Sequence, residues 1–361
     1  MKSTNVSQLS KNEQIVLYHL VKYPTLSDTD ILEIIQMKQS TYSTIKKKLW
    51  REGYYYSMYT PIMQHLGCDL LAVWYITLNR KTRPVDRLAI TGEKLLAATD
   101  LFTIVSEANQ AVNISISKNI AEHIKVSDGF IQLYEENDFL EDIHVVLFPF
   151  EVSYIFSFFD FAPLLNRIFK IESPEMKVDR LVDVDLKKIK CKVKDVQMNE
   201  LEKKVYLSLI RHPESPDSLL SENIGCSRQV FARLKYRFLE ENMLKKHRLV
   251  SLEKLGFEIL VMTHSKFNPS KPIHERQMHM RTITKLQTPI FHIARDPESV
   301  MLTVYKGFDD FKMLHNEYVS YCAENDSLGG EPIEILLSLP RIFNIKWLVY
   351  EPLVRKVLNM S

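Results

Sequence analysis

The chain has 361 residues, of which 45% are hydrophobic and 25% charged, and its formal net charge is +2. A chain of this length is too long to fold around one ordinary hydrophobic core, so we predict two to four domains of about 90–180 residues. The composition excludes extensive disorder. No stretch approaches the ~18 consecutive apolar residues of a membrane span, and the four cysteines form no CxxC pair. We therefore expect a cytoplasmic protein with no membrane partner.

Charge is sorted along the sequence. Residues 1–66 carry eight Lys/Arg against five Asp/Glu, a net charge of +3, whereas residues 67–172 carry nine against fifteen, a net charge of −6. Residues 196–256 are basic again, with eleven against eight, a net charge of +3. Two separate basic segments favour a polyanionic partner that binds at those segments only.

The first 62 residues predict a winged helix-turn-helix. A first helix begins at Ser10 and stops at Pro24, and a second helix follows an N-cap at Ser27 or Asp28. A third helix covers residues 38–51, and residues 54–62 are expected to form a short hairpin wing. The buried positions of the second and third helices are expected to be Ile31, Leu32, Ile34, Ile35, Tyr42, Ile45 and Leu49.

The next hundred residues change pattern. They predict strands and helices in the order strand, helix, strand, strand, helix, strand, which is the split βαβ arrangement of a ferredoxin-like domain. The expected elements are a strand at 70–78, a helix at 85–98, strands at 101–107 and 111–117, a helix at 120–135 and a strand at 143–148.

The same plan returns 189 residues later. LVKYP at 20–24 is answered by LIRHP at 209–213, Leu66-Gly67 by Leu255-Gly256, and TDLF at 99–102 by TPIF at 288–291. We infer an internal duplication of a two-domain unit, with an α+β fold. The predicted domains are residues 1–66 and 196–256 (winged helix-turn-helix), residues 67–172 and 257–361 (ferredoxin-like), and a connector at 173–195.

This order of elements resembles the Lrp/AsnC family of prokaryotic transcription regulators, doubled within one chain. The resemblance implies DNA binding by the winged helices, pairing of the ferredoxin-like domains into a pseudo-dimer or a homodimer, and a small-molecule effector between them. The family's Gly-Asp turn is replaced by residues 108–110 (ANQ) and 296–298 (DPE). Glycine at this turn permits close backbone approach to a ligand. Because this chain lacks that glycine, the sequence identifies no effector.

The polar side of each third helix supplies the predicted DNA contacts. Short hydroxyls near a helix start suit base edges, cations suit phosphates, and Arg and Gln can read guanine and adenine. The predicted contacts in the first half are Lys38, Ser40, Ser43, Thr44, Lys46, Lys47, Lys48 and Arg51. Those in the second half are Arg228, Gln229, Arg233, Lys235, Tyr236 and Arg237, with Lys245, Lys246 and Arg248 in its wing.

Other functions are weighed against this one. His274-Glu275 lacks the second histidine of HExxH, because Met278 stands there, so neither a metal nor a cofactor is expected. Siroheme decarboxylases resemble Lrp/AsnC proteins in fold, and four side chains are conceivable donors to tetrapyrrole carboxylates: His264, Arg276, His279 and Arg281. An architectural DNA-coating or adaptor protein is a third hypothesis. The sequence favours a DNA-binding transcription regulator that is not an enzyme, with double-stranded DNA as its partner.

Overall fold

The computed structural model describes residues 9–171 and 196–360, so the predicted connector lies outside the described residues. The described chain divides into two compact units. Unit 1 comprises residues 9–58, 155–171 and 246–332, and unit 2 comprises residues 59–154, 196–245 and 333–360. Each unit thus joins the helix-turn-helix of one half of the sequence to the ferredoxin-like elements of the other half.

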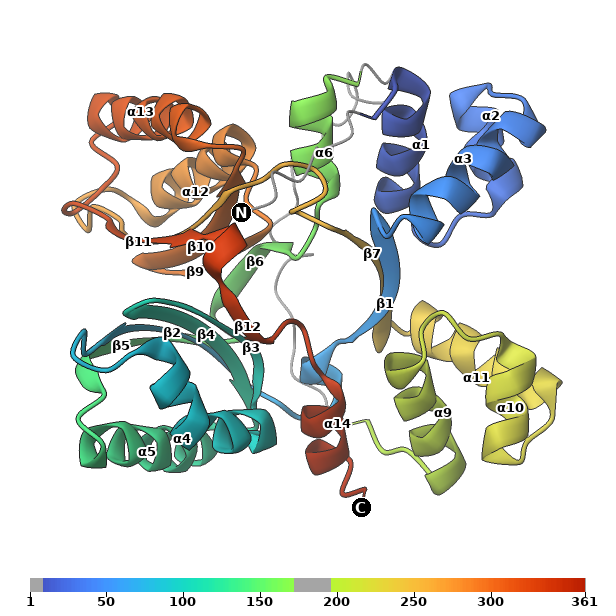
Figure 1. Ribbon diagram of the computed structural model, residues 1–361, viewed down its shortest axis with the longest axis horizontal. Helices are drawn as coiled ribbons and strands as arrows, with labels where there is room; N and C mark the ends of the chain where they lie inside the picture. Colours follow the sequence, from blue (N-terminus) through green and yellow to red (C-terminus); the bar gives the residue numbers. More distant parts are fainter. Residues whose placement is uncertain (1–8, 172–195, 361) are drawn as a thin grey trace. The chain divides into compact units, whose positions relative to one another are not determined.

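The first helix-turn-helix consists of α1 (Lys11–Lys22), α2 (Asp28–Ile35) and α3 (Gln39–Arg51), shown in blue in Figure 1. Ser10 and Glu13 form a capping box at the start of α1, and Ser27 does the same for α2. Ile31, Tyr42 and Leu49 are fully buried. Ile34 was expected in the core but is 37% exposed, because only one narrow side of the short α2 packs against its neighbours.

The second helix-turn-helix repeats this plan with α9 (Glu200–Arg211), α10 (Asp217–Ile224) and α11 (Arg228–Glu240). Asn199 and Glu202 form the capping box of α9, at positions equivalent to those in α1. Gly225 ends α10 with φ = 77°, a left-handed conformation that suits glycine.

The predicted wing hairpins do not form. Each module contributes one strand, β1 (Tyr55–Pro61) and β7 (Leu244–Val250), and these two strands pair as a two-stranded sheet. The sequence between β1 and the next strand contains only a short 3₁₀ turn, η1 (Met63–His65), so no second strand is at hand locally.

The unit 2 sheet has the predicted strand and helix order. Its strands lie in the order β12-β3-β4-β2-β5, and α4 (Pro84–Ala97) and α5 (Ile120–Glu136) cover one face (Figure 1). Side chains of α5 pack against Trp74 and Ile76 to form its core. The strands are β2 (Leu70–Leu78), β3 (Leu101–Glu107), β4 (Gln110–Ser117), β5 (Leu140–Pro149) and β12 (Phe343–Lys346).

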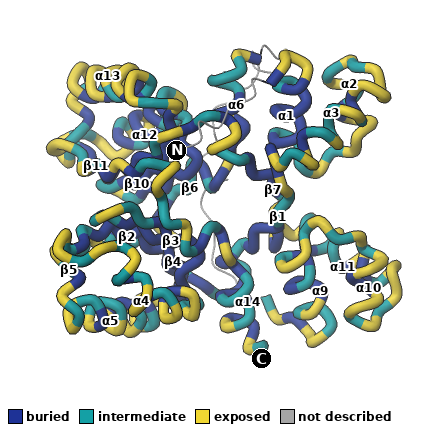
Figure 2. Tube along the Cα trace, viewed as in Figure 1, coloured by how far each residue is buried: buried dark blue, intermediate teal, exposed yellow. Residues whose placement is uncertain are grey.

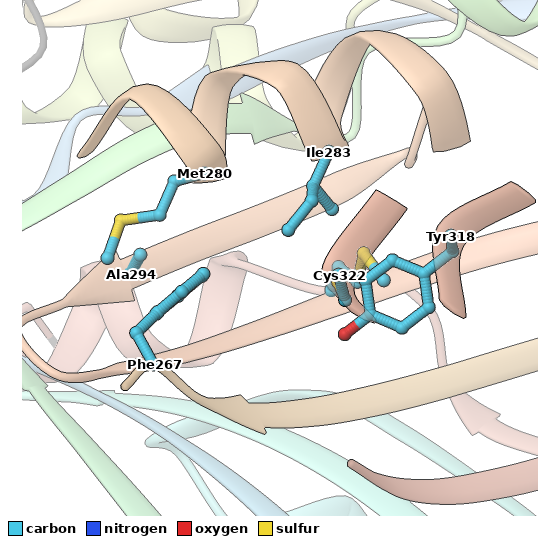
Figure 3. Close-up of a cluster of buried hydrophobic side chains, with 7 residues drawn as sticks. Phe267, Met280, Ile283, Ala294, Tyr318 and Cys322 are labelled. Atoms are coloured by element: carbon cyan, nitrogen blue, oxygen red, sulfur yellow. The ribbon is translucent and has the colours of Figure 1, made fainter. Parts of the chain in front are cut away.

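The second sheet has the order β11-β8-β10-β9-β6, with α12 (Ile273–Gln287) and α13 (Phe308–Glu324) over one face. Figure 3 shows the buried side chains that α12, α13 and the strands contribute to its core. The strands are β8 (Ile259–Lys266), β9 (Phe291–Arg295), β10 (Glu298–Tyr305), β11 (Ile333–Ser338), where the chain passes from unit 1 to unit 2, and β6 (Ser153–Phe158).

Each sheet is completed by a fifth strand from the other half of the sequence. β6 follows the first ferredoxin-like segment but pairs with β9, and β12 follows the second but pairs with β3. Helices α6 (Ala162–Phe169) and α14 (Glu351–Val357) follow these strands, and the 3₁₀ turn η2 (Leu339–Arg341) precedes β12. The α+β fold with two tandem repeats is confirmed, and the exchange of strands is the feature that sequence periodicity missed.

Across the described residues, every helix is either too short or too polar to cross a bilayer.

Candidate functional site

The recognition helix α3 presents a polar, basic side to solvent. Lys38, Ser40, Thr44, Lys47 and Arg51 are exposed, whereas Ser43 is only half-exposed. The burial of Tyr42 and Leu49 on the opposite side fixes this orientation, because residues three and four apart share one side of a helix. Figure 2 shows exposed segments along α3 and α2.

Two of the predicted phosphate contacts on α3 are engaged within the module. The Lys46 ammonium lies 2.6 Å from the Asp28 carboxylate, and the Lys48 ammonium lies 2.6 Å from Glu13. Burial alone would raise the pKa of Asp28, but hydrogen bonds from Lys46 and Tyr42 outweigh it and hold that pKa below its ordinary value. Lys46 and Lys48 therefore hold α3 against α2 and α1, and they are weaker candidates for DNA contact than Lys47 and Arg51.

The equivalent helix α11 exposes a different set of side chains. Arg228, Gln229, Arg233 and Tyr236 are all exposed, and Tyr236 is 65% exposed. An arginine can form paired hydrogen bonds with guanine and a glutamine with adenine, which the single O–H donor of a serine or threonine cannot. The two recognition helices therefore offer different chemistry to a groove.

Lys235 and Arg237 repeat the internal ion pairs of the first module. Lys235 lies 2.8 Å from Asp217, and Arg237 lies 2.7 Å from Glu202. Both cations were predicted to contact DNA. Their ion pairs instead join α11 to α10 and α9.

The wing prediction needs one correction. Lys245 is exposed and Lys246 is half-exposed, but Arg248 is buried, and its guanidinium donates a hydrogen bond of 2.6 Å to the Leu20 carbonyl. Arg248 therefore ties β7 to the end of α1 and has no access to a phosphate. Its position in a basic run gave no sign of this contact, which spans 228 residues of sequence.

One exposed side chain beside the α3 cations was missed. Trp50 is 56% exposed. It follows Lys47 by three residues and therefore lies on the same side of α3. Its position outside the apolar stripe of Tyr42 and Leu49 is the signal that could have identified it. An exposed aromatic ring beside cations can stack against sugar or base.

The four proposed tetrapyrrole donors do not gather at one place. The Arg276 guanidinium lies 3.0 Å from Asp296, and His279 Nδ1 lies 2.8 Å from the Tyr321 hydroxyl. Both residues belong to α12, over the helix-covered face of the sheet. His264 lies one residue before Ser265, which bonds to α13, and it therefore points to the opposite face.

Arg281, the last of these four, is half-buried on α12. Burial lowers the pKa of His279 below its ordinary value, so its imidazole is neutral near pH 7. A neutral histidine is a poor partner for a substrate carboxylate, so this arrangement does not form the expected cationic cluster.

Unit 2 contains a polar cavity of about 200 Å³. None of the predicted DNA or tetrapyrrole contacts lines it. Two smaller cavities, of about 10 and 20 Å³, lie in the interior between the unit 2 sheet and its helices, and each has room for about one water molecule.

Comparison of the sequence with family models and with characterised proteins gives no match. The fold does match solved structures. The siroheme decarboxylase NirDL, solved with an iron-uroporphyrin III analogue, superposes with a TM-score of 0.53 at 11% identity, covering 97% of this chain and 99% of that chain. A second structure of the same enzyme gives the same score, over 97% of this chain and 98% of that chain.

Two transcription regulators match over a smaller part. A regulator from Neisseria meningitidis in complex with L-Met gives a TM-score of 0.34 at 10% identity, over 39% of this chain and 90% of that chain. An AsnC family regulator from Agrobacterium tumefaciens gives 0.32 at 12% identity, over 39% and 89%.

The full-length match corrects one expectation. The prediction that the chain is not an enzyme is contradicted, because the structure that matches it from end to end is an enzyme. The polar sides of α3 and α11 suggested a purely DNA-binding protein. The same fold also occurs in an enzyme, so the fold alone does not distinguish DNA binding from catalysis. What the chain shares with NirDL is therefore its architecture of repeated helix-turn-helix and ferredoxin-like elements.

Proposed function

We propose that the chain is a DNA-binding regulator that places α3 and α11 in major grooves. The observation that carries the proposal is the solvent exposure of Lys47 and Arg51 on α3, on the side opposite its buried stripe, and of Arg228 and Arg233 on α11. Cations on this side of a helix-turn-helix can neutralise DNA phosphates and release counterions.

The two helices would read different sequences. On α3, Ser40 and Thr44 stand near the helix start, where short hydroxyls can approach base edges, with cations farther along. On α11, Arg228, Gln229 and Arg233 supply paired donors for purines. We therefore propose an operator with two unlike half-sites.

Binding to promoter fragments and to random DNA of equal length, measured by fluorescence anisotropy at several salt concentrations, tests the proposal. A regulator should prefer its specific site by about 10³–10⁷-fold. Equal affinity for all fragments would instead indicate an architectural protein, and absence of binding even at 50 mM salt would refute DNA binding altogether.

Arg233 and Arg237 provide a matched pair of variants that tests whether α11 contacts DNA bases. Arg233→Ala should weaken specific binding by about 1–3 kcal/mol and relax the preference at one base position. Arg237→Ala removes the same charge from the same helix, but this arginine is paired with Glu202, so specificity should stay as in the wild type. An equal loss of specificity in both variants would contradict base reading by Arg233.

A second candidate function is the decarboxylation of a siroheme-like tetrapyrrole. The observation that favours it is the end-to-end likeness of the fold to NirDL. The contacts of Arg276 with Asp296 and of His264 with Glu298 would have to open before these side chains could bind substrate carboxylates. Titration with iron-uroporphyrin III, followed by its absorbance and by the masses of any products, tests this candidate. Stoichiometric uptake with loss of CO₂ would favour it, and an unchanged spectrum would exclude it.

Pairing of the chain into homodimers stays a prediction. Measurement of the molar mass in solution, with and without DNA, tests it.

A further inference from the structure

The polar cavity of unit 2 lies where four segments meet. Its lining comes from the turn before β2, the residue after β4, the start of α9 and the end of α14. The lining residues are Leu66, Gly67, Lys118, 196–198, Lys203 and 357–359.

The charged side chains that line this cavity are both lysines. Lys203 pairs with the exposed Glu200 at 2.9 Å, whereas no carboxylate of the described residues forms an ion pair with Lys118. The nearby carboxylates Asp100 and Glu122 are bound by Lys356, at 2.6 and 3.4 Å, and are not part of the lining. The polar side chains among the lining residues are therefore two lysines and two amides, Gln197 and Asn359.

The size of the cavity limits what it can hold. At the ~10–15 Å³ that one water molecule needs in such a cavity, a volume of 200 Å³ has room for more than one layer of water molecules. This is below the ~300–1,000 Å³ of pockets for larger organic ligands. A phosphate or a short carboxylate fits within this volume.

The duplicated half shows why the cavity is open in unit 2. In unit 1, Lys11 at the start of α1 donates a hydrogen bond of 3.2 Å to the Phe169 carbonyl at the end of α6. The residue equivalent to Lys11 in unit 2 is Glu200, which pairs with Lys203 instead. The Lys11–Phe169 contact of unit 1 therefore has no counterpart in unit 2, where the cavity lies between the start of α9 and the end of α14. The two helices meet instead through Arg211 of α9 and Glu351 of α14, whose side chains lie 3.1 Å apart.

Unit 1 also lacks one of the two lysines. Lys306 follows β10 as Lys118 follows β4, but Gln14 stands at the position of Lys203. The Gln14 amide donates a hydrogen bond of 2.9 Å to the Leu9 carbonyl. A pair of ammonium groups therefore occurs at this place in unit 2 alone, although both halves arose from one pattern.

We propose that the unit 2 cavity is a binding site for a small oxyanion, a phosphate or a short carboxylate, held by Lys118 and Lys203. Because its walls belong to α9, the sheet and α14, a bound anion joins the second helix-turn-helix to the ferredoxin-like sheet of the same unit. The site goes beyond DNA binding and does not depend on it.

Isothermal titration of the full-length chain with inorganic phosphate and with malonate, at constant ionic strength in chloride, tests the proposal. We expect saturable binding of at least one of these anions at one site. The one that binds more tightly identifies the ligand as phosphate-like or carboxylate-like. Absence of saturable binding for both would overturn the proposal.

Variants place the binding at this cavity. Lys118→Gln and Lys203→Gln should each raise Kd by about 10- to 100-fold, since a hydrogen bond to a charged group is lost. Lys203→Arg should retain binding, because it keeps the charge. Lys306→Gln is the matched control in unit 1, and Arg233→Ala tests whether the anion binds to α11 instead; both should bind as the wild type does. Undiminished affinity in the Lys118→Gln/Lys203→Gln double variant would overturn the proposal.

A measurement on the wild type covers the case of a variant that does not fold. Phosphate or malonate should protect Lys118 and Lys203, but not Lys306, from acetylation followed by mass spectrometry. Equal acetylation of Lys118 and Lys203 with and without the anion would overturn the proposal.

Discussion

The Lys46 ammonium lies 2.6 Å from the Asp28 carboxylate and joins α3 to α2. In the second module Lys235 and Asp217, each 189 residues later, form the same ion pair at 2.8 Å. Two modules with little sequence identity thus keep the same charged contact. This repeated contact supports the duplication and assigns both lysines a structural role.

The cations of α3 that face solvent and those that pair with α1 and α2 should behave differently in DNA binding. Lys47→Ala/Arg51→Ala removes two exposed charges, so the slope of log K against log salt should become less steep by about 1.8, at 0.9 for each phosphate contact. Lys46→Ala/Lys48→Ala removes the same charge from ion pairs and should change the slope much less. Equal slopes for the two double variants would contradict this division of roles.

Acid should destabilise the protein through His292. This imidazole is fully buried, accepts or donates a hydrogen bond of 2.7 Å with the Thr284 hydroxyl and stacks on Phe156, with ring centroids 5.0 Å apart. Burial lowers its pKa from 6.5 to about 3, so the folded state holds it neutral while the unfolded state takes up a proton below pH 6.5. The stability it contributes is present above pH 6.5 and is lost as pH falls.

The expected loss is about 1.4 kcal/mol per pH unit below 6.5, or about 2 kcal/mol at pH 5. Denaturant unfolding at pH 7 and pH 5 measures it. His292→Gln should reduce the difference between the two pH values by that amount, and His274→Gln, which changes an exposed histidine, should leave it unchanged. A wild-type difference in the His292→Gln variant would show that other groups account for the acid sensitivity.

The ion pair between Lys356 and Asp100 should stabilise the attachment of α14 to the unit 2 sheet. Asp100 is buried and lies 2.6 Å from the Lys356 ammonium. Burial would lower the pKa of Lys356, but the hydrogen bond and charge of Asp100, with Glu122, raise it above its ordinary value.

Lys356→Met should lower the free energy of unfolding by about 2–3 kcal/mol, because it leaves a buried carboxylate without a cation. The figure is below the ~3–5 kcal/mol of fully buried pairs because the Lys356 side chain is 35% exposed and solvent screens part of its charge. Adding Asp100→Asn should recover most of the loss. Additive losses in the double variant would show that the two residues do not interact.

Strand exchange predicts that the two halves of the sequence depend on each other. Residues 1–171 and 196–361, expressed as separate tagged chains in one cell, should copurify, since β6 completes the sheet of the second half and β12 that of the first. Each half expressed alone should aggregate, because it leaves a strand edge and an apolar helix without a partner. Purification of either half as a folded monomer would contradict this dependence.

The sequence by itself determined the elements and their duplication. Hydrophobic periodicity, and capping residues such as Ser10 and Asn199, are local signals, and the strand at Leu70–Leu78 lies where its continuous apolar run predicted it. The exposure of Lys47 and Arg51 follows from the same periods, because a buried stripe fixes the opposite side of a helix.

The tertiary structure alone decided which elements join. Strand pairing depends on contacts between residues far apart in sequence, so nothing near Ser153–Phe158 or Phe343–Lys346 indicates that each strand completes the other half's sheet. The burial of Arg248 against Leu20, the pairing of Lys46 with Asp28 and the cavity at Lys118 and Lys203 arise in the same way. The sequence identifies each charged side chain. Whether that side chain faces solvent, a carboxylate or a cavity depends on which other elements pack against it.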